Sequence, residues 1–563
     1  MSRSTPIIGM LLLLALATGC AGTSEAGPWT PGPSGGPLLP EQGAIDVEHY
    51  ELRLDIDPET RTLEGRLEMT ARVLEPTHKV TMHLDQALEV RSLAVQGVTR
   101  DFVHADGMII AVLNGAMHAG ETMHVAVEYG GAPRPAPRAP WDGGFTWSET
   151  VDGTPWFTTT CQGEGADVWW PCKDHPSDKP GTMDLFITVP EPLVVASNGT
   201  LQSVESRGDG THTYHWHIAS PIGNYNVALN VGPFERIDET YTSVTGEDFP
   251  VHFWVLPESL EQGKAFMPEI LDHLRWFEET LGPYPFRAEK YGVVETPHLG
   301  MEHQSIIAYG NQFRKAEPDY DWLHHHELAH EWWGNLVSCS DWKDMWIHEG
   351  FGTYMQAMYI QDRFGDEAYR DEMETKRQGL VNKRAVAPRE IRNSKQIYFA
   401  PDGTHDNDIY SKGSWILHTL RWYMGDEDFR RFLRLMVYPD ERMAAATDGS
   451  QVRFVDTEDV RAVAEEVSGE DLSWFFEVYL RQPELPELIV SRTRENLELR
   501  WKVPEGLRFP MPVPLQLGDK RVKVLMPSGG ATVPVGDVEL HIDPDEQVLK
   551  RRARLVVDEQ PTP

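Results

Sequence analysis

The chain has 563 residues, of which 40% are hydrophobic and 25% are charged. These proportions are ordinary for a soluble globular protein, and the length allows several domains. The formal net charge of −36 argues against nucleic acid as a partner, because its phosphates would be repelled, and against adsorption on anionic lipid.

The N-terminus has the features of an export signal. Arg3 supplies a positive charge, and residues 6–17 form an apolar run that is too short to cross a bilayer as a helix. The run ends in the sequence LATGC (16–20), which resembles a bacterial lipoprotein cleavage site with Cys20 as the acylated residue. We therefore expect residues 1–20 to be a lipoprotein signal peptide, with a plain secretory signal as the alternative.

The expected location follows from the same resemblance. The residue after Cys20 is Ala21 rather than Asp, which in the lipoprotein sorting of double-membrane bacteria favours the outer membrane. We expect an exported protein that its lipid anchor holds on the outer membrane or in the periplasm of a bacterium. Residues 21–43 are rich in Pro, Gly and Ser, have almost nothing to bury, and are predicted to be a tether.

Strict alternation of apolar and polar residues begins near Val47 and predicts β-strands. The residues expected on one face of the first strand are Tyr50, Leu52, Leu54 and Ile56. Similar runs recur as far as about Phe234. We therefore expect a mostly antiparallel N-terminal β domain over residues 44–235.

Three cysteines follow the signal, and they are Cys161, Cys172 and Cys339. Two of them could pair in an oxidising compartment, but an odd set leaves at least one thiol free. Their spacing fits no zinc knuckle. We expect buried, free thiols.

The apolar period changes to that of a helix over residues 261–281, and Gly282 with two nearby prolines ends it. A strand-like run over 290–296 follows, and helix-rich sequence continues to about Arg481. These features predict a mainly helical domain over residues 236–482.

Alternation returns after residue 486, and prolines interrupt it repeatedly. Such prolines suit the edge strands of a small β-sandwich. We expect a C-terminal β-sandwich domain over residues 483–563. The predicted fold class is therefore α+β, with several domains.

The sequence His326-Glu327-Leu328-Ala329-His330 fits the pattern H-E-x-x-H. In a helix, His326 and His330 lie one turn apart on the same face and can bind one metal ion. Glu327 then lies beside the open coordination position, where it can act as a base on a water. The alternative is a helix whose histidines are ordinary surface or core residues.

A metal site of this kind needs a third ligand, and Glu349 is the candidate. It follows His330 after eighteen intervening residues, in a second helix-like run over 345–364. Two histidines, a glutamate and a water form the open arrangement of a catalytic zinc site, unlike the closed four-cysteine type. We therefore expect one Zn²⁺ per chain.

The residues around these ligands, HELAHEWWGNLV from His326 and WIHEGF from Trp346, closely resemble the gluzincin zinc aminopeptidases of the aminopeptidase N and leukotriene hydrolase family. The resemblance implies an N-terminal antiparallel β-saddle, a thermolysin-like, mainly helical catalytic domain and a small C-terminal β-sandwich. Larger members continue into a helical domain that roofs the active site. We expect this chain to be a short bacterial lipoprotein form that lacks this domain.

Three further signatures resemble those of the family. The sequence CQGE from Cys161 implies that Gln162 reaches the active site as a neutral acceptor beside the substrate amine. Gly300, Met301 and Glu302 resemble the motif of an edge strand that lines the substrate groove, in which the glutamate binds the free α-amine. The sequence YSKG from Tyr410 implies that this hydroxyl donates to the oxyanion of the tetrahedral intermediate.

Two positions depart from the family pattern. His303 stands where the edge-strand motif has Asn, which puts a neighbouring hydrogen bond in doubt. Asp167 stands where many members have Arg, so the loop after Gln162 is expected to have different contacts.

The resemblance and the residues together predict a zinc aminopeptidase that removes N-terminal residues from peptides. Glu327 would deprotonate the water and later protonate the leaving amine, Tyr410 would hold the oxyanion, and Glu302 would pair with the substrate ammonium. The alternatives are a thermolysin-like endopeptidase and a non-catalytic peptide-binding lipoprotein, and the presence of Glu327 disfavours the latter. Nothing selects the epoxide hydrolase activity of one family branch.

Overall fold

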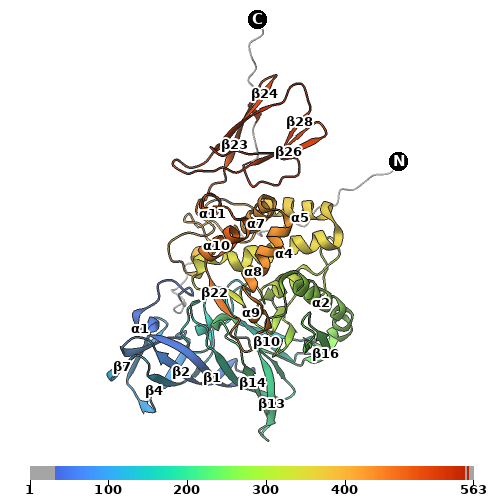
Figure 1. The fold of residues 1–563 in the computed structure, drawn as a ribbon. Coiled ribbons are helices and arrows are strands. Elements are labelled where there is room, and N and C mark those ends of the chain that lie inside the picture. Colours follow the sequence, from blue (N-terminus) through green and yellow to red (C-terminus); the bar gives the residue numbers. More distant parts are fainter. Residues whose placement is uncertain (1–31, 552–554, 557–563) are drawn as a thin grey trace, which may run out of the picture. The chain divides into compact units, whose positions relative to one another are not determined.

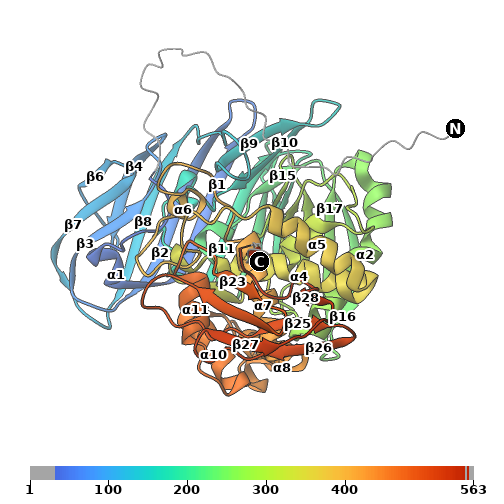
Figure 2. The same ribbon diagram turned by 90° about the horizontal axis from the view of Figure 1, so that it is seen from above.

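The computed structural model describes residues 32–551 and 555–556. Within these ranges the chain runs through strands, then mixed strands and helices, then strands again (Figures 1 and 2). The predicted α+β fold class is confirmed, with an N-terminal β-rich part, a mainly helical central part and C-terminal β-sheets. Cys20 and the expected signal peptide lie outside the described residues. No helix in the described ranges combines the length and the apolar character that crossing a membrane requires.

An eight-stranded sheet forms the main layer of the N-terminal part, in the order β13-β14-β11-β1-β2-β8-β4-β5. Its neighbouring strands are antiparallel except β1 and β11, which are parallel. The predicted alternation on β1 is confirmed, because Tyr50, Leu52, Leu54 and Ile56 are all buried. The strands are β1 (Ile45–Asp57), β2 (Thr62–Val73), β4 (Leu88–Val95), β5 (Val98–Thr99), β8 (Thr122–Gly131), β11 (Thr182–Pro190), β13 (Thr200–Ser206) and β14 (Thr211–Ile218).

Two smaller sheets complete this part, in the orders β12-β15-β10-β9 and β3-β7-β6. Strand β10 ends at Thr160, so the loop that carries Gln162 starts directly at the end of this sheet. The strands are β3 (Thr77–His83), β6 (Phe102–Ala105), β7 (Met108–Met117), β9 (Gly144–Glu149), β10 (Pro155–Thr160), β12 (Val194–Ala196) and β15 (Asn230–Gly232).

The central part begins with a five-stranded sheet in the order β16-β17-β18-β20-β19. Helix α2 (Leu260–Leu281) connects β17 to β18 and confirms the predicted helix. Strand β19 lies at the edge, as predicted, and its Met301 is buried. The strands are β16 (Glu235–Thr242), β17 (Asp248–Val255), β18 (Tyr291–Glu295), β19 (Gly300–Met301) and β20 (Ile307–Tyr309).

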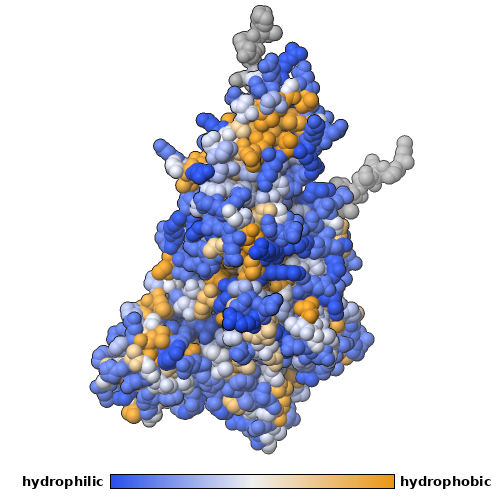
Figure 3. Space-filling model, viewed as in Figure 1, coloured by the Kyte–Doolittle hydropathy of each residue, from blue (hydrophilic) through white to orange (hydrophobic). Residues whose placement is uncertain are grey.

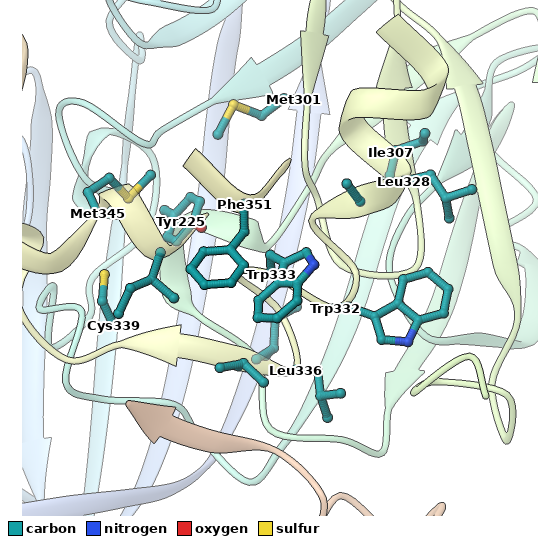
Figure 4. Packing of buried hydrophobic residues seen from close by; sticks show 14 of the residues in the cluster. Tyr225, Met301, Ile307, Leu328, Trp332, Trp333, Leu336, Cys339, Met345 and Phe351 are labelled. Atoms are coloured by element: carbon teal, nitrogen blue, oxygen red, sulfur yellow. The ribbon is translucent and has the colours of Figure 1, made fainter. Parts of the chain in front are cut away.

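A layer of helices follows, and aromatic side chains pack it together. Trp333, just after α3, stacks on Phe351 of α4 with ring centroids 4.3 Å apart, and Figure 4 shows the two rings facing each other. Buried rings of this size contribute on the order of 3–5 kcal/mol each to stability. The contact therefore fixes α3 against α4. The main helices are α3 (Trp322–Ala329), α4 (Trp346–Phe364), α5 (Asp366–Gln378), α6 (Ser394–Tyr398), α7 (Ser411–Met424), α8 (Asp426–Val437), α10 (Thr457–Ser468) and α11 (Ser473–Leu480).

The C-terminal strands form two small sheets, in the orders β27-β24-β23-β29 and β26-β25-β28. Val522 on β26 and Leu525 after it are solvent-exposed. Figure 3 shows an apolar patch on the surface of the C-terminal part. The strands are β23 (Glu487–Arg492), β24 (Asn496–Lys502), β25 (Val513–Leu517), β26 (Lys520–Val524), β27 (Gly530–Pro534), β28 (Leu540–Ile542) and β29 (Leu555–Val556).

The prediction of a tether over residues 21–43 is wrong for its last part. Ser34 is buried, and Gly35 lies against the indole ring of Trp342 with a φ of +78°. The short helix α1 (Pro40–Gly43) follows. Backbone hydrogen bonds hold this segment in place, and Gly35 can lie against the ring because it has no side chain. Neither feature produces an apolar pattern in the sequence.

The cysteine prediction is confirmed for Cys161, Cys172 and Cys339, which are buried and free. Burial raises the pKa of each thiol above its ordinary value. Because the thiolate is the reactive form, these residues belong to the core rather than to the chemistry.

Candidate metal centre and active site

Helix α3 presents His326 and His330 on one face. The helix begins where the Asp321 side chain accepts a hydrogen bond of 3.0 Å from a backbone N–H of the first turn. The two Nε2 atoms are 3.3 Å apart. Nδ1 of His330 lies 2.9 Å from the carbonyl oxygen of Trp333. Since a carbonyl only accepts, Nδ1 carries a proton, and Nε2 is the atom available to bind a metal.

Glu349, in the first turn of α4, completes the metal triad with His326 and His330. Its Oε2 lies 3.5 Å from each of the two Nε2 atoms. Zinc bound tetrahedrally at about 2.0–2.1 Å from its ligands needs ligand atoms about 3.3–3.5 Å apart. This Oε2 is buried and has no hydrogen-bond partner among the described residues. The donor set and its spacing therefore fit zinc.

Buried charge also favours a cation at this position. Burial opposes a positive charge on His330, but Glu349, Glu302 and Glu327 outweigh it and raise the pKa of His330 to about 10. Burial likewise opposes the charge on Glu349, but His330 and His326 hold its pKa far below the usual range. A buried cluster with an excess of carboxylates is stable only with a positive partner.

Glu327, on α3, lies beside the same cluster of ligand atoms. Ligand atoms of Glu327, Glu302 and His330 lie within 4.8 Å of one another. Burial, together with the charges of Glu302 and Glu349, raises the pKa of Glu327 well above its ordinary value, although His330 acts in the opposite direction. A carboxyl group with a raised pKa can both accept and return a proton near neutral pH.

Two glycines allow α4 and α7 to approach closely. A Cβ on Gly413 would lie 2.9 Å from the Cα of Gly350, and a Cβ on Gly350 would lie 3.0 Å from the Cα of Gly413. This contact brings Tyr410, at the start of α7, to the metal triad. Its hydroxyl donates to Oε1 of Glu349 at 2.8 Å. Tyr410 thus lies at the predicted site, with its hydroxyl bonded to a candidate metal ligand.

Glu302 follows β19 and faces the same pocket. A side chain at Gly300 would overlap the Glu327 carboxylate, so only glycine lets the strand lie this close. Glu302 is 4% exposed. Its Oε1 accepts hydrogen bonds from Nε2 of Gln162 at 2.7 Å and from the Tyr225 hydroxyl at 3.2 Å.

Gln162 comes from the N-terminal part, and its side chain contacts Glu302. Its Nε2 donates to Glu302, and its Oε1 accepts from the Tyr398 hydroxyl at 3.1 Å. The two partners determine this orientation, because an amide oxygen facing a carboxylate would be repelled. Its role as an acceptor for the substrate amine stays a prediction.

Family models match both parts of the chain that build this pocket. The model of the Peptidase family M1 domain matches residues 272–479, and that of the Peptidase M1 N-terminal domain matches residues 46–225. The two matches together span more than half of the chain. The chain belongs to peptidase family M1.

Several curated M1 relatives are similar in sequence. Aminopeptidase M1-C of Oryza sativa subsp. japonica is 25% identical over 473 residues, which are 80% of this chain and 51% of that protein. Leucyl aminopeptidase of Saccharolobus solfataricus is 24% identical over 384 residues, which are 63% of this chain and 46% of that protein. The chain spans about half the length of the curated relatives it matches.

Solved structures share the M1 fold. The M1 zinc metallopeptidase of Deinococcus radiodurans matches with a TM-score of 0.63 and 24% identity, covering 78% of this chain and 94% of that one. A glutamate-to-alanine mutant of that metallopeptidase, bound to a Tyr-Ser-Ala substrate, matches with a TM-score of 0.64 and 23% identity, covering 78% and 95%. These likenesses show the fold.

His303 and Asp167 are the two residues that depart from the M1 pattern. Both ring nitrogens of His303 lack partners among the described residues, and burial lowers its pKa to about 3, so the ring is neutral. The backbone carbonyl of Glu302 is instead held by the side chains of Asn226 at 3.0 Å and Asn335 at 3.1 Å. Burial, with Asp174 and Asp85, raises the pKa of Asp167 well above its ordinary value, although the nearby Arg134 acts in the opposite direction.

The sequence reasoning missed three site residues of this M1 chain. Tyr225 and Tyr398 donate hydrogen bonds to Glu302 and Gln162, and Asn335 supports the Glu302 backbone. Asn335 is five residues after His330, within the recognised stretch, so its position was a usable signal. Neither tyrosine lies in a motif, and only the fold brings them to the pocket.

The geometry makes the metal testable without substrate. We expect wild-type protein to hold about one zinc per chain and His330→Ala to lose it, because a site with two remaining protein ligands binds zinc weakly. Glu327→Gln is the control, since this residue is next to His326 but is not a ligand, and it should keep its zinc. Elemental analysis after dialysis measures both. Full zinc content in His330→Ala would refute the assignment.

Proposed function

We propose that this M1 family member is a zinc-dependent aminopeptidase that hydrolyses the first peptide bond of peptides with a free N-terminus. His326, His330 and Glu349 would hold one zinc per chain. The observation that carries the proposal is the position of Glu302, a buried carboxylate with an oxygen within 4.8 Å of ligand atoms of Glu327 and His330. The amine and the carbonyl carbon of one residue are two bonds apart, so an amine acceptor this near the metal triad selects the first residue.

The names of similar proteins support the same activity. The two curated relatives described above are named aminopeptidases, and the Deinococcus radiodurans mutant is bound to a Tyr-Ser-Ala substrate. This chain has a candidate metal triad with Glu327 and Glu302 beside it, and on this basis we extend the activity to it.

The proposed mechanism assigns one task to each side chain. A bound Zn²⁺ would polarise the scissile carbonyl and make a water more acidic. Glu327 is placed to take the proton of the attacking water and to give a proton to the leaving amine. The Tyr410 hydroxyl would turn from Glu349 to donate to the oxygen that becomes negative in the tetrahedral state. Glu302 would hold the substrate ammonium.

The two catalytic side chains predict separate losses. Glu327→Gln should keep zinc but lose turnover by roughly 10²–10⁴, the usual contribution of general acid–base catalysis. Tyr410→Phe should lower kcat by roughly 10²–10³, the usual cost of one oxyanion donor. Steady-state kinetics on an aminoacyl fluorogenic substrate measure both, with zinc content as the control. If Tyr410→Phe were fully active, Tyr410 would be a packing residue at the start of α7 without a catalytic role.

Amine recognition predicts a loss that depends on the substrate. An ammonium gives up water to enter the pocket, and the Glu302 carboxylate compensates with a charge-assisted hydrogen bond. Glu302→Gln should therefore weaken kcat/KM for free-amine substrates by about 2–5 kcal/mol, without changing zinc content. N-acetylation of the substrate should damage the wild type as much, and the two losses should not add.

The same panel distinguishes the proposal from its rivals. Internal cleavage of N-blocked peptides at the rate of free ones would indicate a thermolysin-like endopeptidase. Binding of peptides without any turnover, in a zinc-loaded protein, would indicate a peptide-binding lipoprotein.

We also propose that the protein is exported and held on a membrane by a lipid on Cys20. The support is the LATGC sequence that ends the apolar N-terminal run. Mature protein should begin at Cys20, carry acyl chains and sediment with membranes. Cys20→Ser should move it to the soluble fraction or leave the signal uncleaved, as mass spectrometry of fractionated cells can show. Wild-type protein that begins elsewhere and stays soluble would overturn this location.

A further inference from the structure

Helix α6 touches the Gln162 loop at both of its ends. At its first residue, the Ser394 hydroxyl donates to the carbonyl oxygen of Gly163, the residue after Gln162. At its last residue, the Tyr398 hydroxyl donates to Oε1 of Gln162 at 3.1 Å. The helix therefore holds the backbone and the side chain of this loop separately.

The helix itself is well anchored despite its five residues. Asn393 and Gln396 form a capping box, in which each side chain bonds to the backbone of the other residue. Ser394 is buried. A helix fixed in this way can serve as a rigid support for the side chain at its end.

The segment Ser34–Gly36 closes the arrangement from the other side. The backbone N–H of Ser34 donates to the Gly163 carbonyl at 3.4 Å, and the carbonyl of Ser34 accepts from the backbone N–H of Ser394 at 2.9 Å. Gly35 pairs with Asn393 in a β-bridge. The segment thus joins α6 to the Gln162 loop, which explains why the end of the expected tether is ordered.

We infer that α6 is a positioning element for the amine end of the substrate, with Tyr398 and Ser394 as its positioning residues. Tyr398 fixes the amide of Gln162 so that its Nε2 donates to Glu302, which orients the carboxylate that receives the ammonium. Neither residue bonds to Glu302 itself. The inference rests on the proposed function, because it concerns how Glu302 meets a free amine.

Gln162 without the Tyr398 hydroxyl would lose its fixed orientation. The amide could then rotate, and its Nε2 would be free to leave Glu302. The carboxylate would keep only its bond from Tyr225 at 3.2 Å. The contribution of the substrate amine to binding should fall. Tyr398 also interacts with the Tyr410 hydroxyl, and an effect passed through Tyr410 to the metal triad would weaken a ligand with or without the amine equally.

The test is a direct binding measurement with two probes that differ only in the amine. L-leucine hydroxamate carries the α-amine, and 4-methylpentanoyl hydroxamate has the same skeleton without it. Calorimetry on zinc-loaded protein gives both Kd values, and their ratio measures amine recognition. Tyr398→Phe should lower this ratio roughly threefold to tenfold, the size expected for one neutral hydrogen bond, by weakening the amine probe alone.

Two further variants show whether the effect passes through Gln162. In a Gln162→Ala background, Tyr398→Phe should cause no additional fall in the ratio. Lys395→Ala is the matched control, because Lys395 is an exposed residue of the same helix, and it should leave the ratio at the wild-type value.

Each outcome decides one claim. An unchanged ratio in Tyr398→Phe, or equal weakening of both probes, would overturn the positioning role. If Glu302→Gln lowers the ratio at the same time, the proposed amine recognition survives that result. If the wild-type ratio is near one, or Glu302→Gln leaves it unchanged, the proposed amine site fails and the inference fails with it.

The segment offers a second matched pair. Gly35→Ala would place a methyl group inside the Trp342 ring, whereas Gly36→Ala would meet nothing closer than 3.8 Å; both positions have positive φ, +78° and +89°. The backbone strain is therefore shared, and only Gly35→Ala should displace the segment. We expect Gly35→Ala to lower the probe ratio and Gly36→Ala to preserve it. Equal ratios in the two variants would remove the segment from the inference.

Discussion

The triangle of His326, His330 and Glu349 is the constraint on which the rest of the site depends. A ligand spacing of 3.3–3.5 Å is kept only if α3 and α4 cannot slide against each other. The stack of Trp333 on Phe351 provides this rigidity between the two helices. The spacing of the three candidate ligands therefore depends on aromatic packing close to His330 and Glu349.

A second close contact, between the backbones of α4 and α7, places the Tyr410 hydroxyl beside this triangle. Gly350 follows the ligand Glu349 directly, and Gly413 lies three residues after Tyr410. Their backbones meet, so the distance between a metal ligand and the tyrosine hydroxyl is set by the approach of α4 to α7. A larger residue at either glycine would move the hydroxyl away from the triad without touching any polar group.

The sequence was sufficient for the parts of the site that local patterns encode. The spacing of His326, Glu327 and His330 on one helix follows from the helical period, and the alternation on β1 follows from the pleat of a strand. The third ligand Glu349 and the edge strand before Glu302 were also recognisable, because each lies in a motif with a fixed distance to the first two histidines.

The remaining contacts join residues that are far apart in the chain, and no local pattern encodes them. Gln162 and Tyr398 are 236 residues apart, and Ser34 meets Gly163 and Ser394 through backbone atoms. Backbone hydrogen bonds carry no residue identity, so a Pro/Gly/Ser-rich segment looks like a tether even where it is held. The amide orientation of Gln162 could not be predicted for a related reason, since it depends on Tyr398, a partner that the sequence does not reveal.

The buried carboxylates explain why contacts from distant parts of the chain meet at this site. Glu302, Glu327 and Glu349 are three buried carboxylates, and a divalent metal ion would neutralise only two of them. A substrate ammonium would supply the third positive charge. Burial is the first cause that raises the pKa values of Glu302 and Glu327, and an upward shift is the direction expected where negative charge is in excess. An N-blocked peptide brings no positive charge, so it would leave one of the three negative charges without compensation. Preference for a free N-terminus would then follow from the number of buried carboxylates as much as from the shape of the groove.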